Sequence, residues 1–464
     1  MSLSARPAAR LIRPVLLVAL LAGCGGGPTA DLVAVGRVWT GDTARPWAQA
    51  VAVAGDTILA VGDSVDVFRF VGSGTERLDA GDGLILPGFQ DAHVHFFQGG
   101  FQLATVDLRD AATPGEFVRR TGAHAATLPA GEWILGGDWD HELWPGAPLP
   151  TRQWIDSVTG DRPVFLCRRA GHMARANTAA LTAAGVTRET ADVEGGEIVR
   201  SGREPTGILK DAAMGLVWNA IPSPSAEQMD SAAARAFRHS AASGVTALAH
   251  VSANWGEVAA LKRAHARGAM TARVSVYLDL PRWAEAAETL RVHGPGDELL
   301  RVAGVKGMVD GSLGSRTAWF FDPYADDPGT RGITVNPLDS IRAGVAGADS
   351  AGLQVVVHAI GDRANRWLLD LYDSLASARG AADRRWRIEH AQHLDPAEIP
   401  RFVRSGVIAS MQPYHAIDDG MWADKRIGRR IRTTYAFRGL LDAGATLAFG
   451  SDWTVAPLDP IQGV

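Results

Sequence analysis

The sequence predicts an α/β protein whose main body is a (β/α)8 barrel, also called a TIM barrel. From about residue 84 onward, eight short apolar runs alternate with segments of helical apolar spacing, and eight such units are what this barrel needs. Before residue 84, short apolar pieces broken by glycine turns predict a separate small β-sheet module. Five of the eight runs carry side chains suited to a metal site, which predicts a reactive centre at one end of the barrel.

The amino terminus reads as a targeting segment. Residues 1–23 combine a basic stretch with the apolar run from Val15 to Leu21, and Leu-Ala-Gly-Cys follows. This layout predicts a bacterial lipoprotein signal peptide, cleaved before Cys24, with acylation of that cysteine. A plain signal peptide or an uncleaved anchor is the alternative. With residues 24–30 as a tether, we expect an exported protein of the bacterial cell envelope, lipid-anchored to a membrane.

The composition is that of an ordinary globular chain. The 464 residues are 46% apolar and 21% charged, with a formal net charge of −5. Beyond the signal segment, no apolar run reaches the roughly 18 residues that a membrane span needs. No basic stripe suits a phosphate backbone, so nucleic acid is not expected as a partner. Cys167 is the only other cysteine; it predicts core packing and excludes an internal disulfide.

Spacing sets the domain boundaries. Residues 31–83 form the small β-sheet module, and residues 84–464 form the barrel. Roughly 150 residues separate the first and second barrel runs, whereas a usual β/α loop has about 2–6. We therefore expect an insertion over about residues 100–243, which takes up the strand-like runs EWILGGDW and PVFLCRR. The predicted barrel strands are the run carrying His93 and His95, then 244–250, 272–280, 301–309, 353–358, 386–390, 406–411 and 446–451.

The first barrel run carries a His-x-His pair. His93 and His95 are two residues apart, so both side chains project from the same face of a strand. Neutral imidazoles suit zinc and similar metals. Asp91 lies two residues earlier on the same face. Taken alone, the pair is equally compatible with half-buried strand histidines.

Lys306 sits in an apolar run between Val305 and Met308. An ammonium group cannot bind a cation, but burial lowers the pKa of a lysine. The neutral amine can take up carbon dioxide and form a carbamate, whose two oxygens bridge two metals. A salt bridge from Lys306 to Asp310 is the alternative.

Three further candidate ligands close later runs. His358 follows LQVVV, His390 follows WRI, and Asp452 follows LAFGS. Each has an ordinary alternative, as a core histidine or as a helix N-cap. Because suitable groups occur on predicted strands one, four, five, six and eight, chance placement is a poor explanation. The set predicts a two-metal centre.

These motifs resemble the amidohydrolase superfamily, and within it the amidohydrolase-3 branch of N-substituted formamide deformylase-like metal-dependent hydrolases. The segments that carry the resemblance, in the branch's order, are LPGFQDAHVHF, VKGMVDGSLGSRTA, HAIGDRAN, RIEHAQHL, MQPYH and FGSDW. Similarity runs from about Asp31 to the end of the chain. The branch often has histidine and aspartate after GVTS on the second strand. This chain reads GVTALAHVS, so His250 receives no role.

The resemblance implies a ligand set and a domain partner. His93, His95 and Asp452 would hold one divalent ion, His358 and His390 the other, and carboxylated Lys306 would bridge the two. Zinc is the favoured ion. The amino-terminal strands would belong to a partial β-sandwich that the carboxyl terminus completes. Because the sequence ends at Val464, we expect it to lack the last barrel helix and those final sandwich strands.

A metal-dependent amidohydrolase follows as the predicted function. A metal-bound hydroxide would attack a non-peptide carbon–nitrogen bond of a small-molecule amide, because bound metal lowers the pKa of water to about 7. Asp452 would accept the proton and deliver it to the leaving nitrogen. An esterase or lactonase that uses the same centre is one alternative, and an inactive truncated binding relic is another.

Three residues outside the ligand set are predicted to touch substrate. They are His172 in RRAGHMARANTAAL, Arg316 in GSLGSRTAWF, and His415 in MQPYH. Arg316 would clamp an anionic group. Surface loop positions are the alternative for all three.

Overall fold

A computed structural model describes residues 27–168, 173–193, 196–380 and 382–464. It divides into two units, Met1–Gly88 and Phe89–Val464. The predicted signal peptide, Cys24 and His172 lie outside the described residues, so lipidation and the role of His172 stay predictions. Across the described ranges, every helix is too short or too polar to cross a membrane.

The first unit contains one four-stranded sheet with the order β3-β2-β1-β4. β1 pairs antiparallel with β2 and parallel with β4. Val33, Ala50 and Ala52 of the sheet pack with Val67 of α1 in a small apolar core. This is the β-sheet module that the glycine-broken pattern predicts. Its elements are β1 (Leu32–Trp39), β2 (Trp47–Ala54), β3 (Thr57–Gly62), α1 (Ser64–Phe68) and β4 (Glu76–Ile85).

The second unit is built on eight parallel strands, which confirms the predicted barrel. The hydrogen-bonded order is β5-β12-β13-β14-β15-β16-β17-β18. All eight predicted runs are strands, with ends that differ by a few residues from the predicted ones. The strands are β5 (Phe89–Val94), β12 (Val245–Ala253), β13 (Arg273–Asp279), β14 (Leu300–Met308), β15 (Gln354–Ala359), β16 (Arg387–His390), β17 (Ile408–Met411) and β18 (Leu447–Phe449).

The last strand returns to the first through the segment that follows β18. The amide of Asp452 donates to the carbonyl of His93 at 2.8 Å, and the amide of His95 donates to the carbonyl of Trp453 at 2.6 Å. Val94 and Trp453 form a parallel bridge. Residues 358 or 359 positions apart in the chain thereby become neighbours at one end of the barrel.

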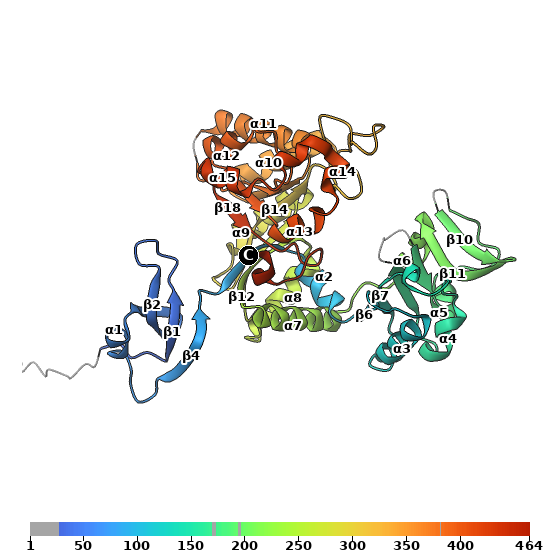
Figure 1. The fold of residues 1–464 in the computed structure, drawn as a ribbon, viewed down its shortest axis with the longest axis horizontal. Helices are drawn as coiled ribbons and strands as arrows, with labels where there is room; N and C mark the ends of the chain where they lie inside the picture. The colour runs from blue at the N-terminus through green and yellow to red at the C-terminus, as the bar shows by residue number, and fades with distance from the viewer. Residues whose placement is uncertain (1–26, 169–172, 194–195, 381) are drawn as a thin grey trace, which may run out of the picture. The chain divides into compact units, whose positions relative to one another are not determined.

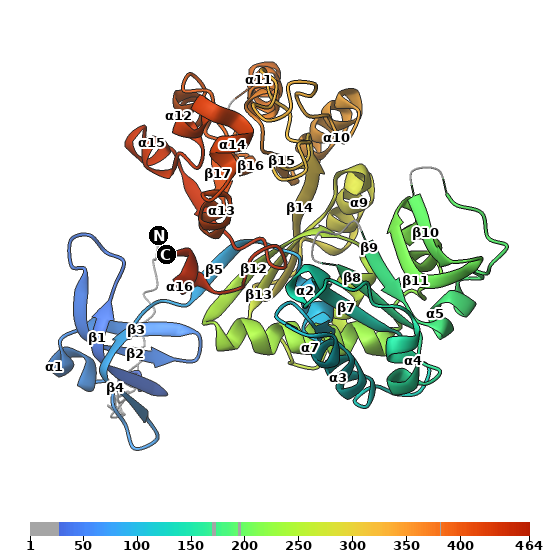
Figure 2. The same cartoon turned by 45° about the vertical axis from the view of Figure 1, so that its right-hand side comes forward.

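Helices cover the outer side of these strands: α10 and α11 contact β15, and α15 contacts β18. These three helices and α12 lie in one group in both views (Figure 1, Figure 2). Local sequence explains where several begin: Ser225 and Gln228 form a capping box at the start of α7, and Asn254 and Glu257 form another at α8. The helices are α2 (Phe96–Gln102), α7 (Ala226–Ala242), α8 (Trp255–Ala266), α9 (Trp283–His293), α10 (Leu338–Ser350), α11 (Asp362–Arg379), α12 (Ile399–Ser405), α13 (Pro413–Asp419), α14 (Ala423–Ile427), α15 (Phe437–Asp442) and α16 (Pro460–Gly463).

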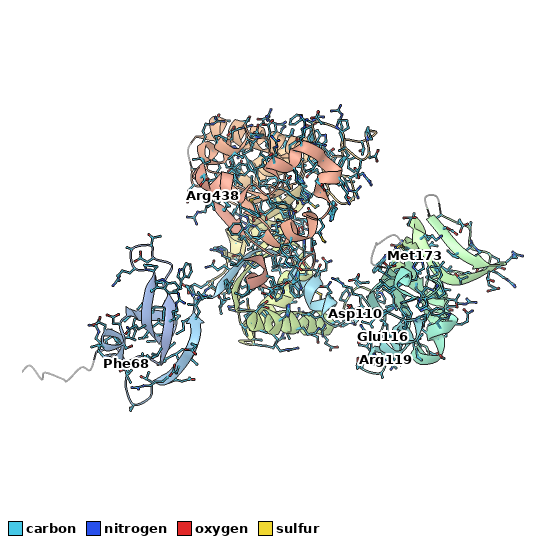
Figure 3. The ribbon with its side chains drawn as sticks, viewed as in Figure 1. Phe68, Asp110, Glu116, Arg119, Met173 and Arg438 are labelled. Carbon is cyan, nitrogen blue, oxygen red and sulfur yellow. The ribbon has the colours of Figure 1, made fainter. Side chains whose placement is uncertain are left out.

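A second sheet lies between β5 and β12 in the chain, as the predicted insertion requires. Its order is β10-β11-β9-β8-β7-β6, and α3–α5 belong to the same body (Figure 2). Thr113 caps α3, whose Glu116 and Arg119 pair across one helical turn (Figure 3). The elements are β6 (Val106–Asp107), α3 (Pro114–Ala125), β7 (Ile134–Trp139), α4 (Gln153–Thr159), β8 (Val164–Arg168), β9 (Met173–Ala176), α5 (Thr178–Ala183), β10 (Gly196–Ser201), β11 (Glu204–Asp211) and α6 (Gly215–Trp218).

The barrel's apolar core holds the strand ends in place. Val355 and Val357 of β15 are fully buried between the strands and the covering helices, with Leu368 and Tyr372 of α11 packed in the same cluster. Tyr372 stacks on Trp386, with ring centroids 4.6 Å apart. Fully burying an apolar side chain such as that of Val355 or Leu368 stabilises the fold by about 1.5–3 kcal/mol. The polar groups at the strand ends are therefore attached to a closely packed core.

Candidate metal centre

The six predicted ligand residues come together at the carboxyl ends of the barrel strands. β5 carries His93 and leads into His95, and the segment after β18 carries Asp452. The other three residues lie on neighbouring strands β14, β15 and β16, where they are Lys306, His358 and His390. All except His95 are buried.

The distances place imidazole, amine and carboxylate groups around one small space. His93 Nε2 lies 3.4 Å from Lys306 Nζ and 3.5 Å from Asp452 Oδ1. His95 Nε2 lies 3.2 Å from the same carboxylate oxygen. Ligand atoms of His93, His390 and Asp452 all lie within 4.8 Å of one another. The ring of His358 completes the group, with its centroid 4.4 Å from that of His390.

Two buried atoms of this group lack the partners that buried polar atoms normally have. Among the described residues, Asp452 Oδ1 and His390 Nδ1 have no hydrogen-bond partner. Leaving a buried acceptor unpaired costs about 1–3 kcal/mol, whereas bound cations would satisfy such atoms. The donor set of imidazoles and one carboxylate is that of zinc and similar divalent ions. The residues present therefore fit a metal.

Hydrogen bonds select which nitrogen of two histidines is free. His93 Nδ1 lies 2.5 Å from the carboxylate of Glu389, so Nδ1 carries the proton and the Nε2 lone pair faces the centre. His358 Nε2 donates to the carbonyl of Gly311 at 3.0 Å, which leaves its Nδ1 free. Partners of this kind fix the tautomer and orientation of metal-binding histidines.

Burial lowers the pKa of the four buried nitrogen groups among the candidate ligands. Desolvation lowers the pKa of His93 and of His390, and it lowers that of His358 to about 3. Desolvation also lowers the pKa of Lys306, as the sequence predicts for a buried lysine. Burial acts in the opposite direction on Asp452, but the surrounding histidines hold the pKa of that carboxyl well below its usual range. Neutral imidazoles beside an ionised carboxylate are the state that binds metal.

The backbone is strained at two candidate ligand positions. His390 has φ of +73° and Asp452 has φ of +57°, both in the left-handed region that non-glycine residues rarely adopt. Ala391 follows at +41°. Such strain costs about 1–3 kcal/mol per residue and concentrates at functional sites. The strained turns aim the two side chains inward.

Asp91 ties the first strand to the segment after β18. Its carboxylate accepts hydrogen bonds from the amide of His93 at 3.0 Å and from the amide of Ser451 at 3.0 and 3.1 Å. Desolvation raises the pKa of Asp91 to about 6, against the lowering effect of these bonds. Asp91 thus acts on the backbone that carries His93 and Asp452.

Gly450 allows these two segments to approach, and we expect Gly450→Ala to disturb the centre. A Cβ at this position would lie 2.6 Å from His93 N and 2.9 Å from Asp91 Oδ1. Since the strand backbone cannot yield without moving His93, overpacking should cost about 1–3 kcal/mol and weaken metal binding. Thermal unfolding and zinc titration measure the two effects. Gly215→Ala is the control, because its Cβ would meet nothing within 4 Å. Equal values for both variants would contradict the role of Gly450.

The sequence did not single out Glu389, Arg387 and Ser410, which form a hydrogen-bonded group with His93. Glu389 is fully buried and accepts hydrogen bonds from His93, Arg387 and Ser410. Desolvation would raise the pKa of Glu389, but Arg387 and His93 hold it far below its usual range. A signal was available: Arg387 and Glu389 are two opposite charges two residues apart, in a run that is otherwise apolar up to His390. Such a pair indicates an internal ion pair on one face of the strand.

The alternative of a salt bridge between Lys306 and Asp310 is wrong. The carboxylate of Asp310 accepts the backbone amides of Trp319, Ile360 and Gly361 at 2.7–2.9 Å. Burial raises the pKa of Asp310 to about 7. Asp310 therefore organises the loop after β14, and Lys306 faces His93 instead.

The two described substrate candidates occupy different surroundings. The ring of His415 on α13 stacks over His390, with centroids 6.1 Å apart, and its Nε2 lies 3.9 Å from Asp452 Oδ2. Arg316 instead pairs with Asp326 at 2.9 Å. The structure thus brings His415 to the centre and engages Arg316 in a loop ion pair.

Comparison with known proteins agrees with this geometry. The family model described as "Amidohydrolase family" matches residues 76–464. The Arabidopsis thaliana protein LONG AFTER FAR-RED 3 is 37% identical over 94% of this chain and 78% of its own. N-substituted formamide deformylase of Arthrobacter pascens is 27% identical over 92% of this chain and 81% of its own.

A solved structure supports the same assignment. An uncharacterized metal-dependent hydrolase from Pyrococcus furiosus superimposes with a TM-score of 0.78 at 28% identity, covering 93% of this chain and 87% of that one. The family match spans the whole barrel and its insertion, and the similarity to solved structures extends over nearly the full length. The chain therefore belongs to the amidohydrolase family of metal-dependent hydrolases.

Proposed function

We propose that this protein hydrolyses a non-peptide carbon–nitrogen bond of a small-molecule amide with the help of two divalent ions. Zinc is the ion that we favour. The observation that carries the proposal is the meeting of His93, His390 and Asp452 within 4.8 Å, with Asp452 Oδ1 buried and unpartnered among the described residues. An unpaired carboxylate oxygen facing imidazole nitrogens is explained by a cation. Such a cation at the end of a barrel suits hydrolysis.

The chain's own residues divide into two ligand groups in this proposal. His93, His95 and Asp452 would hold one ion, and His358 with His390 the other. Lys306 faces the first group, and burial lowers the pKa of its amine, which favours uptake of carbon dioxide; the resulting carbamate would hold both ions. When bound, the ions supply a Lewis acid for the substrate carbonyl and lower the pKa of water to about 7.

Asp452 is the proposed proton carrier. Its carboxylate stays ionised at neutral pH, because its pKa lies well below the usual range, so it can accept a proton from the attacking water. Its second oxygen faces His415, on the side away from His95. The carboxylate can then deliver the proton to the leaving nitrogen.

The choice of a carbon–nitrogen bond rests on similarity. N-substituted formamide deformylase is a relative over most of both chains. The ligand residues themselves do not select the leaving atom, so ester or lactone hydrolysis uses the same groups. A proton donor on the leaving side favours amides, because an amine leaves only after protonation whereas an alkoxide needs less help.

Paired substrates test this proposal. We expect zinc-loaded protein to hydrolyse N-substituted formamides or acylated amines with a higher kcat/KM than the matched esters. The metal-free protein should hydrolyse neither. A panel of amide and ester analogues that differ only in the leaving atom measures this ratio. Faster turnover of every ester would assign the esterase alternative, and no turnover with bound zinc would refute the hydrolytic role for these substrate classes.

A further inference from the structure

We propose that Glu389, held by Arg387, is a positioning residue that sets the tautomer of His93 and thereby the metal affinity of the centre. The inference rests on the proposed metal site and extends it to a residue that binds neither metal nor substrate. Glu389 lies on β16, next to the candidate ligand His390. Its side chain reaches across the barrel interior to β5, 296 residues away in the chain.

The two carboxylate oxygens of Glu389 have different partners. Oε1 accepts from Nε and Nη2 of Arg387, both at 2.6 Å. Oε2 accepts from His93 Nδ1 at 2.5 Å and from the Ser410 hydroxyl at 2.9 Å. Every neighbour is thus a donor. Only a group with acceptors on both sides satisfies them all.

Arg387 holds the same group of residues through a second contact. Its Nη2 also donates to the carbonyl of Ala92 at 2.6 Å, directly before His93 in the chain. Arg387 therefore contacts the backbone of β5, while Glu389 contacts the imidazole. The guanidinium is buried and always charged, so it cannot become an acceptor and it fixes which oxygen of residue 389 faces it.

This geometry predicts what an amide would do at position 389. In Glu389→Gln the amide oxygen must face Arg387, since an NH2 group there would oppose a permanent donor. The NH2 group then faces His93 Nδ1, which must become an acceptor. The proton of His93 moves to Nε2, the nitrogen that faces Lys306 and Asp452. In that tautomer, Nε2 has no lone pair for a metal.

The first test is zinc affinity of the full chain, measured by competition with a chromogenic chelator. We expect Glu389→Gln to weaken binding by about 10–100-fold, as loss of such a partner does elsewhere. In a His93→Ala background, the same substitution should add less than about twofold, because its effect passes through His93. Wild-type affinity in Glu389→Gln, or full additivity with His93→Ala, would overturn the proposal.

The matched control is Glu398→Gln. Glu398 is also a buried carboxylate with two arginine partners, Arg366 and Arg401. Its replacement leaves the same kind of unpaired cation but touches no histidine of the centre. We expect its zinc affinity to stay within about twofold of wild type. Equal losses in Glu398→Gln and Glu389→Gln would show a general effect on folding and refute positioning.

A second measurement needs neither the Glu389→Gln protein nor metal. In metal-free wild-type protein, ¹⁵N spectra of labelled histidine, assigned by comparison with His93→Ala, should show His93 with the proton on Nδ1. A proton on Nε2 would overturn the proposal even if zinc binds. Conversely, a proton on Nδ1 in a protein that fails to bind zinc would sink the proposed metal site and leave the positioning geometry intact.

Discussion

Replacing Asp452 with asparagine is expected to lower kcat by about 10²–10⁴-fold, the range for loss of a general acid–base group. KM should change by less than about threefold, because the group acts on the transition state and not on substrate binding. Asparagine keeps the size of the side chain and one oxygen that can bind metal, but it cannot accept a proton. Steady-state kinetics at neutral pH on the amide substrate measures both values.

Zinc content separates this effect from loss of metal. We expect the Asp452→Asn protein to retain at least part of its zinc, and kcat must be compared at measured occupancy. Asp349→Asn is the control, since Asp349 is a half-buried carboxylate paired with Arg379 and Arg384 at the end of α10, outside the centre. Unchanged kcat in Asp452→Asn would refute the proton-carrier role.

Removal of divalent ions should abolish turnover, and zinc alone should restore it. The purified wild-type protein is expected to hold about two ions per chain, as two-metal hydrolytic sites do. His358→Ala should lower this to about one, because a ligand of the second ion is lost while His93 and Asp452 remain. Elemental mass spectrometry on the purified proteins gives the stoichiometry.

A surface histidine provides the comparison for that experiment. His265 on α8 pairs with Asp297 at 2.9 Å and is partly exposed. His265→Ala should keep both ions and the wild-type kcat. One ion in the wild-type protein, or two in His358→Ala, would contradict the proposed division of ligands.

The barrel strands could be predicted because most of them are largely buried on both faces; β18, whose Phe449 is exposed, is the exception. A strand covered by helices on one side and filled with side chains on the other reads as a continuous apolar run. Val355, Val356 and Val357 of β15 show this, since all three are fully buried. A ligand at the end of such a run stands out, because it is a polar group where the pattern calls for another apolar one.

Partner choice could not be predicted in the same way. The chain places Asp310 only four residues after Lys306, which made a salt bridge a reasonable alternative. In the fold, Asp310 is turned toward the amides of Ile360 and Gly361, while Lys306 faces His93. Proximity in the sequence carries little information once a strand ends and the loop after it turns away.

Arg316 is a second residue whose ion-pair partner could not be predicted from the sequence. Its motif suggested an anion clamp, but its partner Asp326 lies ten residues later in the same loop, and Arg426 of α14 joins that carboxylate. Which of several acidic groups an exposed arginine selects depends on loop packing that no periodic pattern encodes.

The sequence by itself determined the fold class, the order of the barrel strands, the insertion after the first one, and which polar residues end them. These features are local, because apolar spacing and turn residues act over a few positions at a time. Only the tertiary structure decided the pairings that tune the centre: Glu389 with His93, Gly311 with His358, and Asp91 with Ser451. Each joins segments separated by tens to hundreds of residues, and closing the barrel is what brings them within hydrogen-bond distance.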